Sequence, residues 1–334
     1  MTIKDLARAT GYGVATVSRV LNGQPNVSQK ARAAILQAVA ESGFQVNVNA
    51  KQLKQQHAAC ILVVVKGTAN EMFCRMVEFI QAHAAKTDHP LVVEYLDEDA
   101  DEVQRAEQLC RERKPRGILF LGGNHQNFRN HFHKITIPCV LVSNDASSLP
   151  FPNLSSVSTD DRLAARRAID LLVELGHRQI AIVGGDRTGS DIGRLRYEGC
   201  LDCIREHDLT FDEVLDYQQA RFSFQDGYDA AANLLRLGRK FTALFAASDV
   251  MAIGAIRALR DHGLRVPEDV SVIGFDGLEL GSYLVPQLST VVQSVRQMAD
   301  RSMELLLQSL AEDTPARHET VPFTVNQRES TQTV

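Results

Sequence analysis

The segment TIKDLARATGYGVATVSRVLNG, residues 2 to 23, predicts two short helices separated by a glycine-containing turn. Gly11 and Gly13 end the first helix, and the second begins near Val14. Its end falls at Asn22, which is followed by glycine, a favoured helix stop. The apolar positions that predict the buried sides of the two helices are Leu6 and Ala9 in the first and Val17, Val20 and Leu21 in the second.

The other side of the second helix carries small, hydroxyl, basic and amide side chains and no acidic one: Ala15, Thr16, Ser18, Arg19 and Asn22. Phosphate oxygens and base edges in the major groove of DNA need such hydrogen-bond donors. The pattern therefore favours the recognition helix of a helix-turn-helix. The alternative is a helical hairpin that only packs against the rest of the protein.

The charge of the chain is distributed unevenly between its start and its remainder. Residues 1–57 hold seven Lys and Arg but only two Asp and Glu, a net charge of +5. The whole chain carries −5, so the other residues carry −10. A basic head on an acidic body indicates that contact with a polyanion is confined to one end.

Length and composition narrow the class of protein. A chain of 334 residues with 44% hydrophobic residues is long enough for a small domain and a larger two-lobed one. No run reaches the roughly 18 apolar residues of a membrane helix, and the N-terminus does not resemble a signal peptide. We therefore expect a cytoplasmic protein that does not contact the membrane.

Cysteine and histidine do not predict a metal site or a cofactor. Cys200 and Cys203 are the one close cysteine pair, and they fall in a helical pattern without a second pair. We expect them to be core residues, with metal or redox use as the alternative. His125, His131 and His133 lie in a polar stretch and are expected on the solvated surface.

A third helix is predicted from Ser28, its cap, to Ser42. Its core positions are expected to be Ile35, Leu36, Val39 and Ala40. The following residues, 44–57, are polar, basic and nearly free of acid. They predict either a flexible linker or a short helix that forms only on DNA, with Leu53 wedged in the minor groove.

From residue 60 onward, apolar runs alternate with amphipathic helical patterns, which predicts parallel sheets covered by helices. The expected strands are 60–65, 91–96, 117–121, 139–143, 180–183, 243–246 and 271–275. The expected helices are about 72–86, 101–113, 162–175, 193–206, 225–238 and 249–262. Seven strands exceed one comfortable sheet, and residues 150–153 (PFPN) interrupt the series, so two lobes with a cleft between them are expected.

Polar residues follow several predicted strands and are expected to face this cleft: Ser143, Asn144, Asp145, Ser248, Asp249 and Asp276. Arg196 lies near the start of a helix, and a guanidinium beside a carboxylate can bind the neighbouring hydroxyls of a sugar. Phe73 and Phe222 would cover an apolar face of the ring. The alternatives are that Asp249 only caps a helix and that Asp276 only makes a turn.

With these features in this order, the chain resembles the LacI/GalR family (lactose and galactose repressors) over nearly its full length. The motifs that carry the resemblance are VATVSRVLN (14–22), LGH (175–177), GRLRYEG (193–199), SDVMAIGA (248–255), VPEDVSVIGFD (266–276) and PQLSTV (286–291). The chain departs from the family pattern at Gly13, Val46 and Ser248, where Ser, Pro and Asn are usual.

The resemblance implies a homodimer on a pseudopalindromic operator in double-stranded DNA. By position, Val14, Ala15 and Arg19 would contact base edges. Phosphates would be held by Thr16, Ser18 and Asn22, and Leu53 would wedge into the central base step. The implied effector-binding residues are Phe73, Asn144, Arg196, Phe222, Ser248 and Asp276.

The implied fold is an all-α helix-turn-helix head followed by an α/β body that resembles periplasmic binding proteins. The expected domains are the head at 1–46, a hinge at 47–57 and a two-lobed effector-binding and dimerisation domain at 58–334. Lobe 1 would comprise about 58–158 and 291–317, and lobe 2 about 159–288 and 318–330. The last helical segment would cross back to lobe 1.

The function that these expectations support is a transcriptional repressor whose small-molecule effector, a sugar or sugar derivative, acts as an inducer. The alternative within the family is a corepressor, such as a purine. A solute-binding protein is disfavoured by the basic head. An enzyme is disfavoured because the glycine-rich residues 184–189 lack the G-x-G-x-x-G spacing and no Walker-type G-K-[ST] occurs.

Overall fold

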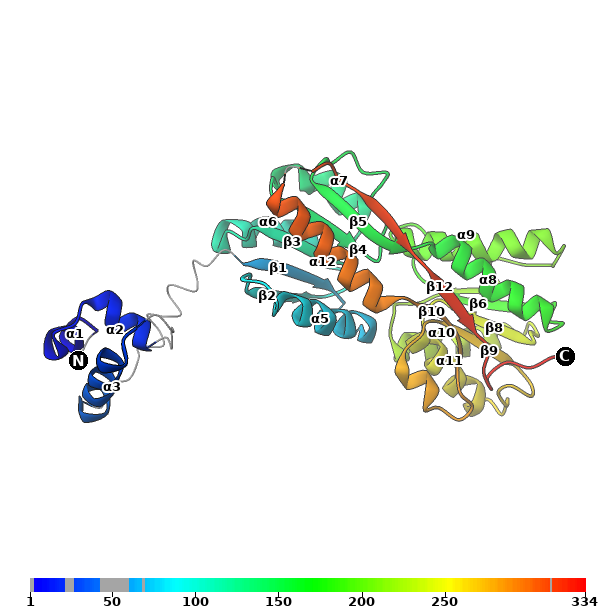
Figure 1. The fold of residues 1–334 in the computed structure, drawn as a ribbon. Helices are drawn as coiled ribbons and strands as arrows, with labels where there is room; N and C mark the ends of the chain where they lie inside the picture. Colours follow the sequence, from blue (N-terminus) through cyan, green and yellow to red (C-terminus); the bar gives the residue numbers. More distant parts are fainter. Residues whose placement is uncertain (1–2, 22–26, 43–59, 68–69, 313) are drawn as a thin grey trace. The chain divides into compact units, whose positions relative to one another are not determined.

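The computed structural model describes residues 3–21, 27–42, 60–67, 70–312 and 314–334 (Figure 1). The chain divides into two compact units, residues 1–58 and 59–334. Among the described residues, no helix combines the length and the apolar character that a membrane crossing requires.

The first unit consists of α1 (Ile3–Thr10), α2 (Val14–Leu21) and α3 (Gln29–Ser42) around a small core. Leu6, Val17 and Ile35, one from each helix, are fully buried in it. The α2 helix begins where predicted, and the Gly13 carbonyl accepts the first hydrogen bonds of its backbone. The predicted helix-turn-helix is therefore confirmed.

Three core predictions in this unit are wrong. Ala9 is exposed and Ala7 is buried instead, while Leu36 of α3 is 49% exposed. An α-helix turns about 100° per residue, so Leu36 points away from the side on which Ile35 packs. Ala40 is exposed for the same reason.

The first sheet of the second unit has the strand order β11-β5-β4-β3-β1-β2, and all neighbouring strands are parallel. Its strands are β1 (Ile61–Lys66), β2 (Leu91–Leu96), β3 (Gly117–Leu121), β4 (Cys139–Val142), β5 (Leu154–Thr159) and β11 (His318–Val321). The strand order reverses between β1 and β3, which is where open parallel sheets bind ligands.

The second sheet has the order β12-β10-β9-β8-β6-β7, and β12 alone is antiparallel to its neighbour. Its strands are β6 (Ile180–Gly184), β7 (Tyr217–Gln219), β8 (Ala243–Ala246), β9 (Ser271–Asp276), β10 (Ser289–Gln293) and β12 (Phe323–Asn326). Two mainly parallel sheets therefore form two lobes, as predicted.

Helices cover both faces of each sheet (Figure 1). In the first lobe, α5 (Glu71–Ala84) and α12 (Val295–Ala311) cover one face, and α6 (Glu102–Arg113) and α7 (His125–His131) cover the other. In the second lobe, α8 (Asp161–Glu174) and α9 (Asp191–Glu206) lie opposite α10 (Phe224–Arg236) and α11 (Asp249–Asp261). Short 3₁₀ helices occupy Phe132–Lys134 and Glu279–Ser282.

All seven predicted strands are present, with ends that shift by at most one residue. Five further strands were not predicted, because they are short or polar: β5, β7, β10, β11 and β12. Strand β5, for example, reads LSSVST, yet each of its residues is buried between the sheet's two helical layers. A polar strand of this kind lacks the apolar run by which strands were recognised.

The lobes are connected at three points, of which the second and third lie later in the chain than expected. The chain leaves the first sheet after Thr159, so β5 still belongs to lobe 1 although it follows the interruption at 150–153. It returns after Gln293, not before 291. The last passage falls between β11 and β12, so residues 318–321 belong to the first sheet and not to lobe 2.

Candidate functional site

The helix-turn-helix exposes the side of α2 that carries the predicted contacts. Val14, Ala15 and Arg19 are exposed, and Thr16 and Ser18 are half-buried. The apolar side of the helix is buried in the core through Val17 and Val20. Asn22 and Leu53, the other two predicted contacts, lie outside the described residues, as does the whole hinge segment 47–57.

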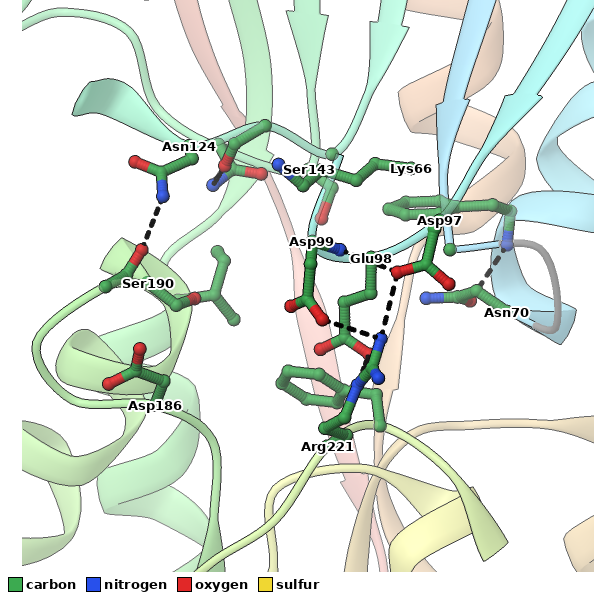
Figure 2. A pocket seen from close by; sticks show the side chains of 18 of the residues that line it. Lys66, Asn70, Asp97, Glu98, Asp99, Asn124, Ser143, Asp186, Ser190 and Arg221 are labelled. Atoms are coloured by element: carbon green, nitrogen blue, oxygen red, sulfur yellow. Dashed lines mark hydrogen bonds and ion pairs between the residues drawn. The ribbon is translucent and has the colours of Figure 1, made fainter. Parts of the chain in front are cut away.

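A cavity of about 530 Å³ lies between the two lobes, at the carboxyl ends of strands from both sheets (Figure 2). This volume falls within the range of small-molecule sites in proteins. The first lobe lines it with residues that follow β1, β2, β3 and β4, and the second with residues that follow β6, β7 and β9.

Five of the six predicted effector residues line this cavity: Phe73, Asn144, Arg196, Phe222 and Asp276. The sixth, Ser248, is not among the described lining residues and is buried. Its hydroxyl oxygen accepts a hydrogen bond from the Met251 amide and so caps α11. Ser248 therefore has a structural role as a helix cap, and its contact with an effector stays a prediction.

Arg196 and Asp276 form the base of the cavity. Arg196 Nε donates to Asp161 Oδ1 at 2.7 Å, and its Nη1 lies 3.7 Å from Asp276 Oδ1. The guanidinium also lies over the Phe275 ring, 3.6 Å from the ring centroid. Because Arg196 is held on three sides, its position is set before any ligand binds.

Backbone strain marks two of the lining residues. Ser143 has φ 78° and Asp276 has φ 112°, in a region that residues other than glycine seldom adopt. Such strain persists only where surrounding contacts hold it, and it is common at binding sites. In this protein it directs two polar residues at strand ends into the cavity.

Burial raises the pKa of two carboxyl groups, that of Asp276 in the cavity lining and that of Asp249 outside it. It raises the pKa of Asp276 to about 6 and, with the neighbouring Asp276 charge, that of Asp249 to about 8. Asp249 is absent from the described lining; its carboxylate accepts hydrogen bonds from the Thr290 hydroxyl and the Leu278 amide, both at 2.6 Å. The alternative that Asp249 has a structural role is therefore supported, and its partners extend beyond its own helix.

The charged wall of the cavity was not predicted from the sequence; it consists of Lys66, Asp97, Glu98, Asp99, Asp186, Arg221 and Asp226. Lys66 is the last residue of β1, and residues 97–99 directly follow β2. The rule that ligands bind at the carboxyl ends of parallel strands would have found them, since both strands were predicted. Arg221 follows β7, which was not predicted.

The lobes contact each other beside the cavity. Asn124 Nδ2 donates to the Gly189 carbonyl at 2.7 Å, and His125 Nδ1 lies 3.1 Å from Asp191 Oδ2. The expectation of a solvated His125 is thus wrong, because it is buried against a carboxylate of the other lobe. His131 and His133 are half-buried and exposed, respectively.

Cys200 and Cys203 are buried free thiols on α9, in agreement with a core role. The Cys203 thiol donates to Asp170 at 2.9 Å, and His207 lies beside the same carboxylate. Asp170, Cys203 and His207 have metal-binding groups within 4.8 Å of one another. Arg166 and Arg167 also form ion pairs with Asp170, so the cluster is part of a charge network outside the cavity.

Both parts of the chain match the models of known protein families. Residues 2–47 match the model of bacterial regulatory proteins of the lacI family. Residues 169–331 match a periplasmic binding protein-like domain. Both matches agree with the fold, a helical head and a two-lobed α/β body.

Relatives of similar length show the same organisation. The chain is 33% identical to the transcriptional regulator MalR of Clostridium butyricum, over 99% of both chains. It is 26% identical to the lac repressor dimer bound to operator and an anti-inducer, with a TM-score of 0.80 and 99% of both chains covered. The regulator CelR in complex with cellobiose gives a TM-score of 0.74 at 26% identity and the same coverage. The chain therefore belongs to the LacI family of DNA-binding transcriptional regulators, a family of regulators and not of enzymes.

Proposed function

We propose that this protein is a transcriptional repressor whose operator affinity is lowered by a sugar or sugar derivative bound between the lobes. The observation that carries the proposal is the base of the cavity. There, Arg196 Nη1 lies 3.7 Å from Asp276 Oδ1, and Asn144, Phe73 and Phe222 are also among the lining residues. A guanidinium, a carboxylate and an amide bind hydroxyl groups, and aromatic rings cover the apolar face of a sugar.

The structures of relatives support a sugar as the ligand class. CelR is bound to cellobiose in the complex described above. The lac repressor, which shares the fold over its full length, holds its anti-inducer while bound to operator. Ligands that bind one lobe arrangement better than another shift the population between the two, by an amount equal to their difference in affinity.

For the DNA contacts, we propose that Val14, Ala15 and Arg19 read base edges in the major groove. The proposed phosphate contacts are Thr16, Ser18 and Asn22, and Leu53 of the hinge, residues 47–57, is the proposed minor-groove wedge. The exposure of the first three side chains on α2 supports this assignment.

We also propose that the protein acts as a homodimer. Large apolar side chains remain exposed on the second lobe, at Phe224, Leu280, Tyr283 and Val285. Exposed apolar surface is typical of an interface, and a two-fold dimer matches a palindromic operator. Light scattering after size-exclusion chromatography would measure the oligomeric state.

The function is tested by first selecting a genomic operator with the purified protein and then titrating sugars. Fluorescence anisotropy is expected to show binding to that duplex but weaker binding to a scrambled one, and a sugar is expected to release it. A ligand that strengthens operator binding would establish corepression and contradict induction. Preference for no duplex, with or without sugars, would contradict the proposal itself.

A further inference from the structure

The charged side chains around the cavity indicate which sugars it accepts. Six lining residues are carboxylates: Asp97, Glu98, Asp99, Asp186, Asp226 and Asp276. Three are cations: Lys66, Arg196 and Arg221. Carboxylates thus outnumber cations two to one on the walls, and the lining carries a net negative charge.

Each of these three cations is already paired with carboxylates. Lys66 Nζ lies 2.6 Å from Glu102 Oε2, and Arg196 is held by Asp161 and Asp276, as described above. Arg221 reaches from the second lobe to a loop of the first, where its guanidinium lies 3.1 to 3.4 Å from three carboxylates (Figure 2): Asp97, Glu98 and Asp99. Glu102 and Asp161 add two further negative charges just behind the walls.

The helix N-termini around the cavity are also occupied. Three helices of eight or more residues begin at its edge, and each has a side-chain oxygen that caps it: Asn70 for α5, Ser190 for α9 and Ser223 for α10. The first turn of each also holds a carboxylate, from Glu71, Asp191 and Asp226, respectively. The partial positive charge that could attract an anion is therefore already offset.

We infer that the ligand of this cavity is an uncharged polyhydroxylated sugar, and that sugar phosphates and sugar acids are rejected. The inference rests on the proposed function, since it concerns the same cavity. An anionic ligand would face a negative wall and would have to take a cation away from a carboxylate that already pairs with it. A neutral sugar faces neither obstacle, because its hydroxyls donate to the carboxylates and accept from the guanidinium groups without breaking the pairs.

The first experiment compares neutral sugars with their anionic counterparts by isothermal titration calorimetry on the full-length protein. The neutral set is glucose, galactose, ribose, maltose and cellobiose; the anionic set is glucose 6-phosphate, galacturonate and ribose 5-phosphate. We expect a neutral sugar to bind, and the anionic sugars to bind at least tenfold more weakly. An anionic sugar that binds as tightly as the best neutral one overturns the inference but supports the proposed sugar function, whereas a panel without any binding contradicts both.

The second experiment is a gain of function. The triple variant Asp97→Asn, Glu98→Gln and Asp99→Asn removes the partners of Arg221 and three negative charges from the wall. We expect its affinity for glucose 6-phosphate to rise at least tenfold, with a strong dependence on salt. The matched control removes the same residue types at exposed positions away from the cavity, Asp88→Asn, Glu112→Gln and Asp208→Asn, and is expected to leave that affinity unchanged.

Folding of the triple variant is verified by its operator binding. Asp99 is 79% exposed, so the single variant Asp99→Asn keeps the test open if the triple variant does not fold. A folded variant that gains no affinity for the phosphate overturns the inference, as does an equal gain in the control.

Discussion

The hydroxyl of Thr159 donates a hydrogen bond to Gln293 Oε1 at 2.8 Å, and both side chains are buried. Thr159 is the last residue of β5, before the first passage between the lobes, and Gln293 is the last residue of β10, before the second. Gln293 Nε2 in turn donates to Asp276 Oδ1 at 2.8 Å. Asp276 of the cavity is thereby linked, through Gln293, to two of the three connections between the lobes, the one after Thr159 and the one after Gln293 itself.

We expect Gln293→Leu to weaken the response to effector. The change keeps a side chain of similar volume but leaves Asp276 and Thr159 without this partner. Hydrogen bonds to charged groups contribute about 1.5–3 kcal/mol, so the sugar concentration for half-maximal operator release is expected to rise roughly 10- to 100-fold. Operator titrations measure it, with Gln308→Leu on the exposed side of α12 as the control. An unchanged half-maximal concentration would show that Gln293 does not couple the two regions.

The Asp276→Asn variant is expected to bind operator normally and to lose its response to sugar. Asparagine has the same shape but cannot form the ion pair with Arg196 or accept as strongly from sugar hydroxyls. Anisotropy with and without sugar measures both properties. Asp269→Asn, which alters an exposed ion pair with Arg265 on the same lobe, serves as the control. Loss of operator binding by folded Asp276→Asn protein would contradict the assignment.

Arg196→Ala tests stability more than recognition. If Arg196 only contacted the effector, this variant would abolish the effector response alone, but the side chain is 4% exposed and neutralises Asp161. Removal of one partner from a buried ion pair costs about 3–5 kcal/mol. We expect a loss of that size in the free energy of unfolding, measured by urea denaturation. A loss below about 1 kcal/mol would mean that Asp161 finds another partner or is hydrated.

Stability is expected to fall as the pH rises from 5 to 8. The pKa of Asp249 is raised to about 8 by burial, whereas in the unfolded chain it is near 4. Between these values the folded state retains a proton that the unfolded chain has lost. The free energy of unfolding therefore decreases by up to about 1.4 kcal/mol per pH unit from this carboxyl.

Thermal melts from pH 5 to 8.5 measure this dependence, and Asp249→Asn is expected to flatten it. The control is Asp269→Asn, because the Arg265 side chain lowers the pKa of Asp269 to about 2 and that group stays charged over the whole range. Identical slopes for wild type and Asp249→Asn would disprove the assignment of this proton.

Arg19→Ala is expected to reduce the discrimination between operator and random DNA by about 1–3 kcal/mol, the contribution of one good base contact. Arg8→Ala is the control, because its side chain on α1 is 83% exposed and its loss removes the same charge. The control should weaken binding to both duplexes equally. If Arg19→Ala left the ratio of operator affinity to random-DNA affinity unchanged, the assignment of Arg19 to a base edge would be contradicted.

The sequence by itself determined the elements whose signals are local. The helix-turn-helix was predicted because the apolar positions of α2 repeat with the helical period and glycines flank it. The seven apolar strands were predicted because each is a continuous run bounded by polar residues. Five effector positions were placed at the cavity because strand ends of parallel sheets meet at one edge, and because the family motifs mark them.

Only the tertiary structure decided which distant residues meet. His125 has the sequence context of a surface residue, but in the structure it is buried and contacts Asp191 of the other lobe. Strand β5 is polar and forms because both of its neighbours offer hydrogen-bonding edges. The charge of the cavity depends on Arg221 reaching three carboxylates more than 120 positions earlier in the chain. Such pairings follow from the arrangement of the two lobes, and no local pattern of residues encodes them.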